Sequence, residues 1–269
     1  MIVIFGIFLL TLLVITAIAI VRTDNLFVAV MLMGIASLLI AANFFLLDAA
    51  DVALTEAAVG AGISTVLFLG ALALTSERER AKSSNRILSF IVVAAAALII
   101  IYATFDKPRF GDPEAPVQTH VAPWYLEKTP EYNDIPNVVT AVLGSFRGYD
   151  TLGEVFVVFT AGIGVLFLLG GGKAASVLPQ EKINEGLRHH LIPRVVGRVL
   201  IPFILLFGLY VQFHGEYGPG GGFQAGAIIA ASVILFALLE GEQRALSVLP
   251  ERALLGLIAF GPLLYGGVG

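Results

Sequence analysis

Long apolar runs alternate with short polar segments along most of this chain. A helix needs about 20 apolar residues to cross the hydrocarbon core of a bilayer, and eight stretches reach or approach that length. They are residues 2–21, 26–47, 52–74, 87–104, 152–170, 195–213, 223–240 and 252–267. The pattern predicts an all-α polytopic membrane protein with about eight transmembrane helices.

The composition agrees with a membrane protein. Hydrophobic residues make up 58% of the chain and charged residues 13%, whereas soluble domains carry about 25% charged residues. The mean hydropathy is +0.91. The segment Met1 to Val21 carries no charge, and we expect it to be a retained helix and not a cleaved signal peptide. The absence of cysteine excludes disulfides, thiol catalysis and thiolate-bound metals, and no basic stripe suggests nucleic acid.

Basic residues concentrate in alternate loops and predict the topology. Twelve of the 16 fall on one side: Arg22, Arg78, Arg80, Lys82, Arg86, Lys173, Lys182, Arg188, Arg194, Arg198, Arg244 and Arg252. By the positive-inside rule this side is cytoplasmic, so both termini are expected outside. The remaining four lie in one long outer segment: Lys107, Arg109, Lys128 and Arg147.

Two connecting segments are long enough to matter for organisation. The outer segment Phe105–Tyr149 is rich in proline and contains Trp124, the only tryptophan. Loops of this kind are usually functional or packed against partners. The polar, glycine-containing stretch Gly170–Arg194 includes His189-His190 and is typical of a linker. We place the main boundary near residue 175.

Carboxylates at membrane depth are the sharpest candidates for chemistry. A charged group there costs at least about 2.5 kcal/mol on insertion scales, so a retained one usually faces protein, water or an ion path. Asp51 opens the third span, and Glu56 lies about one and a half turns further in. Small residues flank Glu56 and favour close helix packing. Glu56 therefore either exchanges protons in an ion path or forms a structural hydrogen bond to a partner helix.

Glu154 near the start of the fifth span has two interpretations. Thr151 followed three residues later by Glu154 fits a capping box, which is a structural role. An ion-path role is the alternative. Asp150 is expected to be solvated, and Arg147 is close enough to pair with either acid.

Other polar residues in the spans favour structural roles. Asn43 is expected to hydrogen-bond across helices. Glu240 and Glu242 end the seventh span, where we expect their side chains to snorkel into water.

The segment His214–Gly226 joins the sixth and seventh spans and combines histidine, acid, proline and glycines. His214 is either a proton relay, since imidazole titrates near neutral pH, or a satisfied hydrogen-bonding group. The glycines lack a phosphate-loop pattern and instead favour close backbone packing. No pair of histidines shares a helix face at membrane depth, so no metal site is predicted. The motif residues of interest are Gly218, Pro219, Gly220, Gly221, Gly222, Phe223 and Gly226.

These residues carry a resemblance to a known family. His214–Gly226 resembles the HGxxxPGGGFxGG signature of the B component of Mrp-type multisubunit Na+/H+ antiporters, with Ala225-Gly226 replacing the last glycine pair. Asp51–Gly60 and the spans around it resemble a small domain in the C-terminal part of the Mrp A component, which is a separate protein in membrane-bound hydrogenases. Phe146–Glu154 resembles the segment that follows it there.

The resemblance divides the chain into three modules. Residues 1–80 are similar to the small domain of the A component, residues 81–175 form a two-helix module with the long outer loop, and residues 176–269 form the B-like module. The large antiporter-like domain of the A component is missing. The B-like module has three spans where the family usually has four, so it is expected to be truncated or completed by another chain.

The resemblance implies a transport protein of the plasma membrane, not an enzyme, with partners that include large antiporter-like subunits and with no cofactor. Na+ and H+ would be the transported ions. Glu56 and Glu154 match acids in the family's coupling region, with Asp51 and His214 as further candidates for the ion path. Two alternatives stay open: a membrane-arm subunit of a membrane-bound hydrogenase or related redox complex, and a scaffold without its own ion path.

Overall fold

The computed structural model describes residues 2–73, 78, 86–109, 111–170 and 191–268. Helices dominate these ranges, and eight of the described helices are long and apolar enough to cross a membrane. This confirms the all-α fold and the number of spans expected from the sequence. The linker that includes His189-His190 lies largely outside the described residues.

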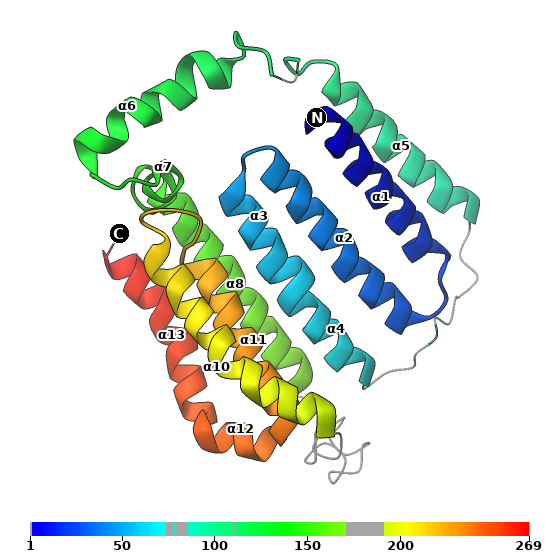
Figure 1. Cartoon of the computed structure of the whole chain (residues 1–269), viewed down its shortest axis with the longest axis vertical. Coiled ribbons are helices and arrows are strands. Elements are labelled where there is room, and N and C mark those ends of the chain that lie inside the picture. The colour runs from blue at the N-terminus through cyan, green and yellow to red at the C-terminus, as the bar shows by residue number, and fades with distance from the viewer. Residues whose placement is uncertain (1, 74–77, 79–85, 110, 171–190, 269) are drawn as a thin grey trace.

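The first half of the chain forms a layer of packed helices. Its elements are α1 (Ile2–Arg22), α2 (Leu26–Leu46), α3 (Ala50–Glu56), η1 (Ala57–Ile63), α4 (Ser64–Ala73) and α5 (Arg86–Thr104). The third span is continuous from Ala50 to Leu72, but its middle part η1 is a π-helix. Helix α2 packs against α1, α3, η1 and α4. Helix α5 lies at the edge of the molecule in Figure 1, and its described side chains are almost all exposed.

The long outer segment is largely helical. It contains η2 (Val117–Val121), α6 (Ala122–Tyr132), α7 (Val138–Ala141) and η3 (Val142–Phe146). The ring of Phe146 lies 5.5 Å from Trp124 and 5.4 Å from Tyr125, measured between ring centroids. These edge-on aromatic contacts hold α6 against η3. Figure 1 shows α6 crossing the end of the molecule at which both chain termini lie.

The second half of the chain supplies four spans and one short connecting helix. They are α8 (Gly148–Gly170), α10 (Leu191–His214), α11 (Gly222–Glu240), α12 (Glu242–Val248) and α13 (Glu251–Val268). Helices α10 and α11 form the most extensive pair, and α11 also contacts η1. Helix α13 packs on α8, where the Tyr265 hydroxyl donates a 3.3 Å hydrogen bond to the Gly148 carbonyl.

Glycines allow close helix packing at several points within the described residues. A Cβ on Gly34 of α2 would lie 2.9 Å from Thr65 Oγ1 of α4, and a Cβ on Gly208 of α10 would lie 2.8 Å from Ile229 Cγ1 of α11. Both distances are shorter than ordinary contacts, so only glycine lets these helices approach so closely. The third span in turn packs against α11, and this contact positions the site described next.

Candidate functional site

The turn between α10 and α11 is compact and depends on glycine. Gly221 has a φ of 140°, a conformation that side chains with a Cβ rarely adopt. Its N–H donates to the Val211 carbonyl at 3.3 Å. A Cβ on Gly220 would lie only 2.5 Å from the same carbonyl oxygen. Gly220 and Gly221 therefore let the turn fold back onto the end of α10, whereas nothing lies within 4 Å of a Cβ on Gly226.

Residues from all three predicted modules meet at this turn. The Asp51 Oδ1 atom of α3 accepts a hydrogen bond from the Gly220 N–H at 3.3 Å. Asn137, which precedes α7, donates from Nδ2 to the Gly218 carbonyl at 2.8 Å and to Asp51 Oδ1 at 3.5 Å. Thr140 donates to the Gly215 carbonyl at 2.6 Å. We call Asp51, Asn137, Thr140 and the turn 215–220 the three-module junction.

A second set of hydrogen bonds, next to the junction, joins the third span to α11. Gln224 of α11 donates to the Thr55 hydroxyl at 2.7 Å, and Thr55 donates in turn to the Asp51 carbonyl at 2.9 Å. An apolar cluster lies beneath this chain of hydrogen bonds and joins α10, α11 and the third span: Val211, Ala225, Ile228, Leu54, Ala58 and Ile204. The third span and α11 are thus joined by both polar and apolar contacts.

Glu56 occupies the last position of α3, directly before the π-helix η1. Its side chain is half-buried and lies beside Gly60, where an added Cβ would be 2.6 Å from Glu56 Oε1 and 2.9 Å from Ser37 Cβ. The Ser37 side chain of α2 and the Glu56 carboxylate therefore share the space that Gly60 leaves open. Within the described residues, Glu56 forms no ion pair. Short π-helical segments inside spans frequently occur at functional sites.

His214 ends α10 and stacks on Tyr210 of the same helix, with ring centroids 4.8 Å apart and an interplanar angle of 16°. It lines a cavity of about 720 Å³ together with Phe5, Ala50 and Pro219 among others. Asp51 and His214 thus approach the same glycine-rich turn from different elements. Within the described residues the His214 imidazole forms no hydrogen bond, and its part in an ion path stays a prediction.

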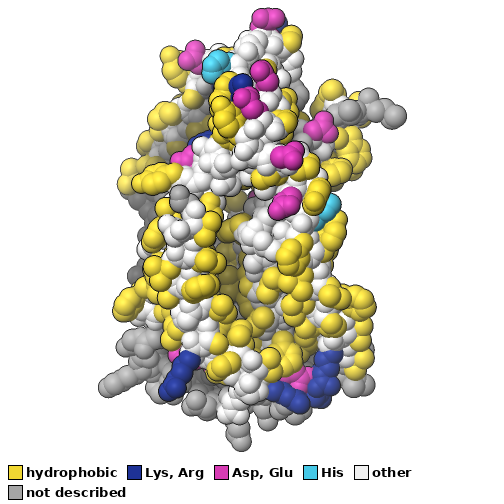
Figure 2. Space-filling view, turned by 90° about the vertical axis from the view of Figure 1, so that its left-hand side faces the viewer, with side chains coloured by type: hydrophobic (Ala, Val, Ile, Leu, Met, Phe, Trp, Pro, Cys, Tyr) yellow, Lys and Arg dark blue, Asp and Glu magenta, His cyan; other side chains and the backbone are white. Residues whose placement is uncertain are grey.

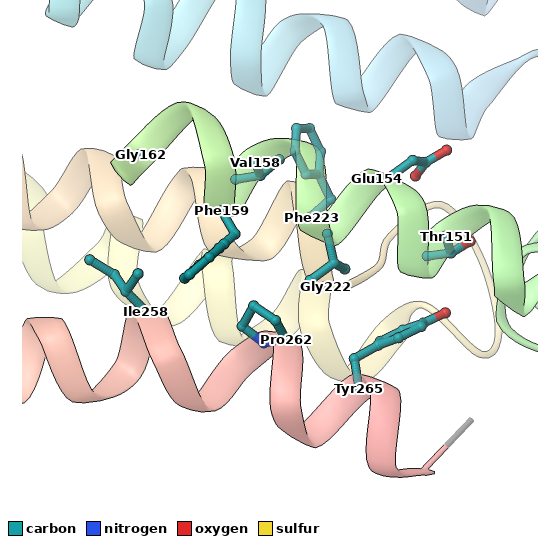
Figure 3. Close-up of a pocket in the computed structure, with 11 residues that line it drawn as sticks. Thr151, Glu154, Val158, Phe159, Gly162, Gly222, Phe223, Ile258, Pro262 and Tyr265 are labelled. Carbon is teal, nitrogen blue, oxygen red and sulfur yellow. The ribbon is translucent and has the colours of Figure 1, made fainter. Parts of the chain in front are cut away.

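Glu154 lies in the early part of α8. It is exposed and lines a largely apolar cavity of about 510 Å³ between α8, α11 and α13. Figure 3 shows Phe159, Pro262 and Tyr265 directed into this cavity, whereas the carboxylate of Glu154 points away from α13. Among the described residues, no hydrogen bond links Glu154 to Glu56.

The capping box expected at Thr151 is wrong. Helix α8 begins at Gly148, three residues earlier, so Thr151 lies inside the helix. Its hydroxyl instead donates to the Leu143 carbonyl of η3 at 2.8 Å. The expected pairing of Arg147 is found with Asp150, through an Nε–Oδ2 hydrogen bond of 2.6 Å on the exposed surface. Glu154 therefore has no capping role that would explain its position.

Two further polar predictions were also wrong. Asn43 donates to the Leu39 carbonyl of its own helix at 2.8 Å and not across helices. The Glu240 side chain is only 2% exposed, whereas it was expected to snorkel into water. It is held by three arginines, Arg194, Arg198 and Arg244, and the attraction of these charges outweighs hydration of a lone carboxylate.

The sequence did not lead us to Asn137 as a site residue or to the π-helix η1 in the third span. Asn137 caps α7, since its Oδ1 accepts from the Val139 N–H at 3.0 Å. The signal was present, because an asparagine after a proline and before an apolar run is a typical helix start. The π-helix has no comparable signal in a single sequence. No group of three potential metal-binding side chains occurs in the part of the chain that the structure describes.

The fold and the junction define a multi-pass membrane protein whose three predicted modules are joined at one end of the spans. Three protein families match the chain in succession. Residues 11–77 match MbhD, the D subunit of MBH, and residues 86–177 match MbhE, the E subunit of MBH. Residues 192–269 match the domain related to the MnhB subunit of Na+/H+ antiporter.

Similar proteins follow the same pattern. A probable K(+)/H(+) antiporter A/B subunit of Rhizobium meliloti (strain 1021) is 26% identical over 77% of this chain and 23% of its own length. A putative antiporter subunit mnhA2 of Staphylococcus saprophyticus is 32% identical over 52% of this chain and 17% of its own length. A chain in the structure of the Mrp complex from Dietzia sp. DQ12-45-1b has a TM-score of 0.73 and 27% identity, over 88% of this chain and 26% of that chain.

The chain is thus similar to Mrp-type subunits and carries an MnhB-like domain behind MbhD-like and MbhE-like segments. It is a multi-pass protein of the plasma membrane. It spans about a quarter or less of the length of the antiporter relatives it matches.

Proposed function

We propose that the chain is a membrane subunit of a multisubunit monovalent cation/proton antiporter, to which it contributes an ion path and contacts with other subunits. The observation that carries this proposal is the position of Glu56, an acid inside a membrane span at the start of a π-helix. The names of the relatives, which are antiporter subunits, support the transport class. Na+ and H+ are the proposed cargo.

The surroundings of Glu56 suit proton exchange. Its carboxylate is half-buried inside a membrane span and lies close to the Ser37 side chain of α2. The protonated acid can donate a hydrogen bond to the adjacent Ser37 hydroxyl, and the ionised acid can accept one from it. Ser37 can thus serve both protonation states without a change of partner. The gap at Gly60 leaves both side chains room to reorient.

The other candidate residues have different proposed places along the path. Asp51 and His214 lie at the end of the spans near the chain termini, where they would form its mouth. Glu154 is exposed on α8, so we propose that it faces another subunit of the complex. The large antiporter-like subunits would be among these partners. The long exposed face of α5 is a second surface for such contacts.

The proposal is tested by replacing Glu56→Gln in the complete complex. The glutamine keeps the size and hydrogen-bonding capacity of the side chain but cannot ionise, so we expect normal assembly and loss of cation-dependent proton transport. Glu216→Gln is the matched control, since the Glu216 side chain is exposed and only its backbone carbonyl takes part in the junction, where it accepts from the Asn137 N–H. Assembly and transport at wild-type level in Glu56→Gln would leave only a scaffold role and refute the ion path.

A second candidate function rests on the matches of residues 11–77 and 86–177 to MBH subunits. In that case the chain would belong to the membrane arm of a redox complex and would couple electron transfer elsewhere to ion movement. Gentle purification with identification of the partners separates the two. Large antiporter-like subunits would support the antiporter, whereas hydrogenase or iron–sulfur subunits would support the redox complex.

A further inference from the structure

The buried acid Glu240 organises a cluster of arginines at the end of the molecule opposite the chain termini. Arg194 and Arg198 come from α10, and Arg244 comes from α12. Arg194 Nε lies 3.4 Å from Glu240 Oε1, and Arg244 Nη1 lies 2.8 Å from Oε2. Arg198 contacts Oε1 through both Nε and Nη2. We call these four residues the arginine cluster.

The arginine cluster carries more positive charge than its acid can balance. Among the described residues, three guanidinium groups face one carboxylate, and arginine stays protonated in proteins. Each guanidinium has five N–H donors, whereas Glu240 offers two oxygens. The side chains of Arg198 and Arg244 remain 48% and 54% exposed. Glu240 thus fixes the arginines in place and leaves donors of two of them accessible.

A cavity of about 420 Å³ opens beside these donors. It is lined by Arg198, Ile201, Phe236, Glu240 and Arg244. Ile201 follows Arg198 by three residues on α10, and Phe236 precedes Glu240 by four on α11, so both apolar side chains lie about one turn deeper along their spans. The cavity therefore has a cationic rim and an apolar wall toward the middle of the membrane. Figure 2 shows the basic side chains gathered at this lower end, with acidic ones among them.

A cationic rim followed by an apolar wall matches the headgroup and the acyl chains of an anionic phospholipid. We propose that the cavity binds one such lipid, with its phosphate on Arg198 and Arg244 and an acyl chain along Ile201 and Phe236. Basic pockets between spans are a recurrent form of anionic lipid site. The excess charge favours an anionic headgroup over a zwitterionic one. A free phosphate would use the rim but would leave the apolar wall without a partner.

The experiment uses the assembled complex in nanodiscs of phosphatidylcholine that contain increasing fractions of phosphatidylglycerol. Retained lipid is measured by native mass spectrometry after release, and thermal stability is measured in parallel. In Arg244→Gln, Glu240 keeps Arg194 and Arg198. We expect about a fivefold weaker retention of phosphatidylglycerol, because one basic side chain near the surface is lost. Arg252→Gln, exposed on α13 outside the cavity, is expected to retain it like the wild type.

A second variant, Ile201→Trp, fills the apolar part of the cavity and leaves the arginine cluster intact. It is expected to displace the lipid even if Arg244→Gln fails to assemble. Wild-type retention of phosphatidylglycerol in Ile201→Trp overturns the proposal, and so does equal retention in Arg244→Gln and Arg252→Gln. Inorganic phosphate is the separate arm. If phosphate stabilises the complex in pure phosphatidylcholine as much as phosphatidylglycerol does, the site binds a free anion and not a lipid.

Discussion

Asp51 accepts a hydrogen bond from the backbone N–H of Gly220, a residue 169 positions later in the chain. This contact ties the first module to the glycine-rich turn of the last one. Asn137 of the middle module donates to the same carboxylate. One acidic side chain thus takes part in joining three modules, and its structural role can be separated from its charge.

Asp51→Asn is expected to assemble at nearly the wild-type level. The amide oxygen can still accept from Gly220 and Asn137, so only the charge is lost. Asp51→Ala removes the acceptor and is expected to lower stability by about 1–3 kcal/mol. Thermal unfolding of the purified complex measures the difference. Equal stability of the two variants would show that the hydrogen bonds contribute little.

Gly220→Ala is expected to destabilise the turn. The added Cβ would lie 2.5 Å from the Val211 carbonyl oxygen, which is backbone and cannot rotate away. Overpacking of this kind costs about 1–3 kcal/mol. Gly226→Ala is the control, because nothing lies within 4 Å of a Cβ there and alanine favours a helix. Comparable yields of the two variants in membranes would contradict the importance of the turn.

Gly60→Ala tests the space between Glu56 and Ser37. The methyl group would push the two side chains away from each other, so we expect reduced transport with the complex still assembled. Gly62→Ala lies in the same π-helix and would meet only the Ala57 carbonyl at 3.5 Å, an ordinary contact. Transport by both variants is compared in membrane vesicles. The interpretation fails if Gly60→Ala transports as well as Gly62→Ala.

Glu240→Gln is expected to be the most destabilising of these changes, by about 3–5 kcal/mol, because it leaves three arginines without their buried counter-charge. The measurement is the unfolding temperature of the complex. Glu242→Gln, two residues away and exposed, is expected to have little effect. A similar unfolding temperature for both variants would mean that water or lipid already balances the positive charge of the arginines.

The sequence predicted the spans well, because a membrane requires long apolar runs and each run is visible locally. It also predicted that Glu56 lies among small residues inside the third span. It did not predict the partners of Glu240, since Arg194 and Arg198 are more than 40 positions away and no local sequence pattern indicates the contact. Thr151 was misplaced because its side chain bonds to the preceding segment, a tertiary contact that overrides the capping pattern.

The 169-residue separation between Asp51 and Gly220 also has a consequence for biosynthesis. At the usual rate of translation, the ribosome needs roughly 10 to 30 s to add that length of chain. During this interval the first module must be threaded into the membrane while the turn that completes its binding surface does not yet exist. Insertion of the first module and formation of its contact with Gly220 are therefore separate events in time. A chaperone or insertase that shields the first module has many seconds in which to act.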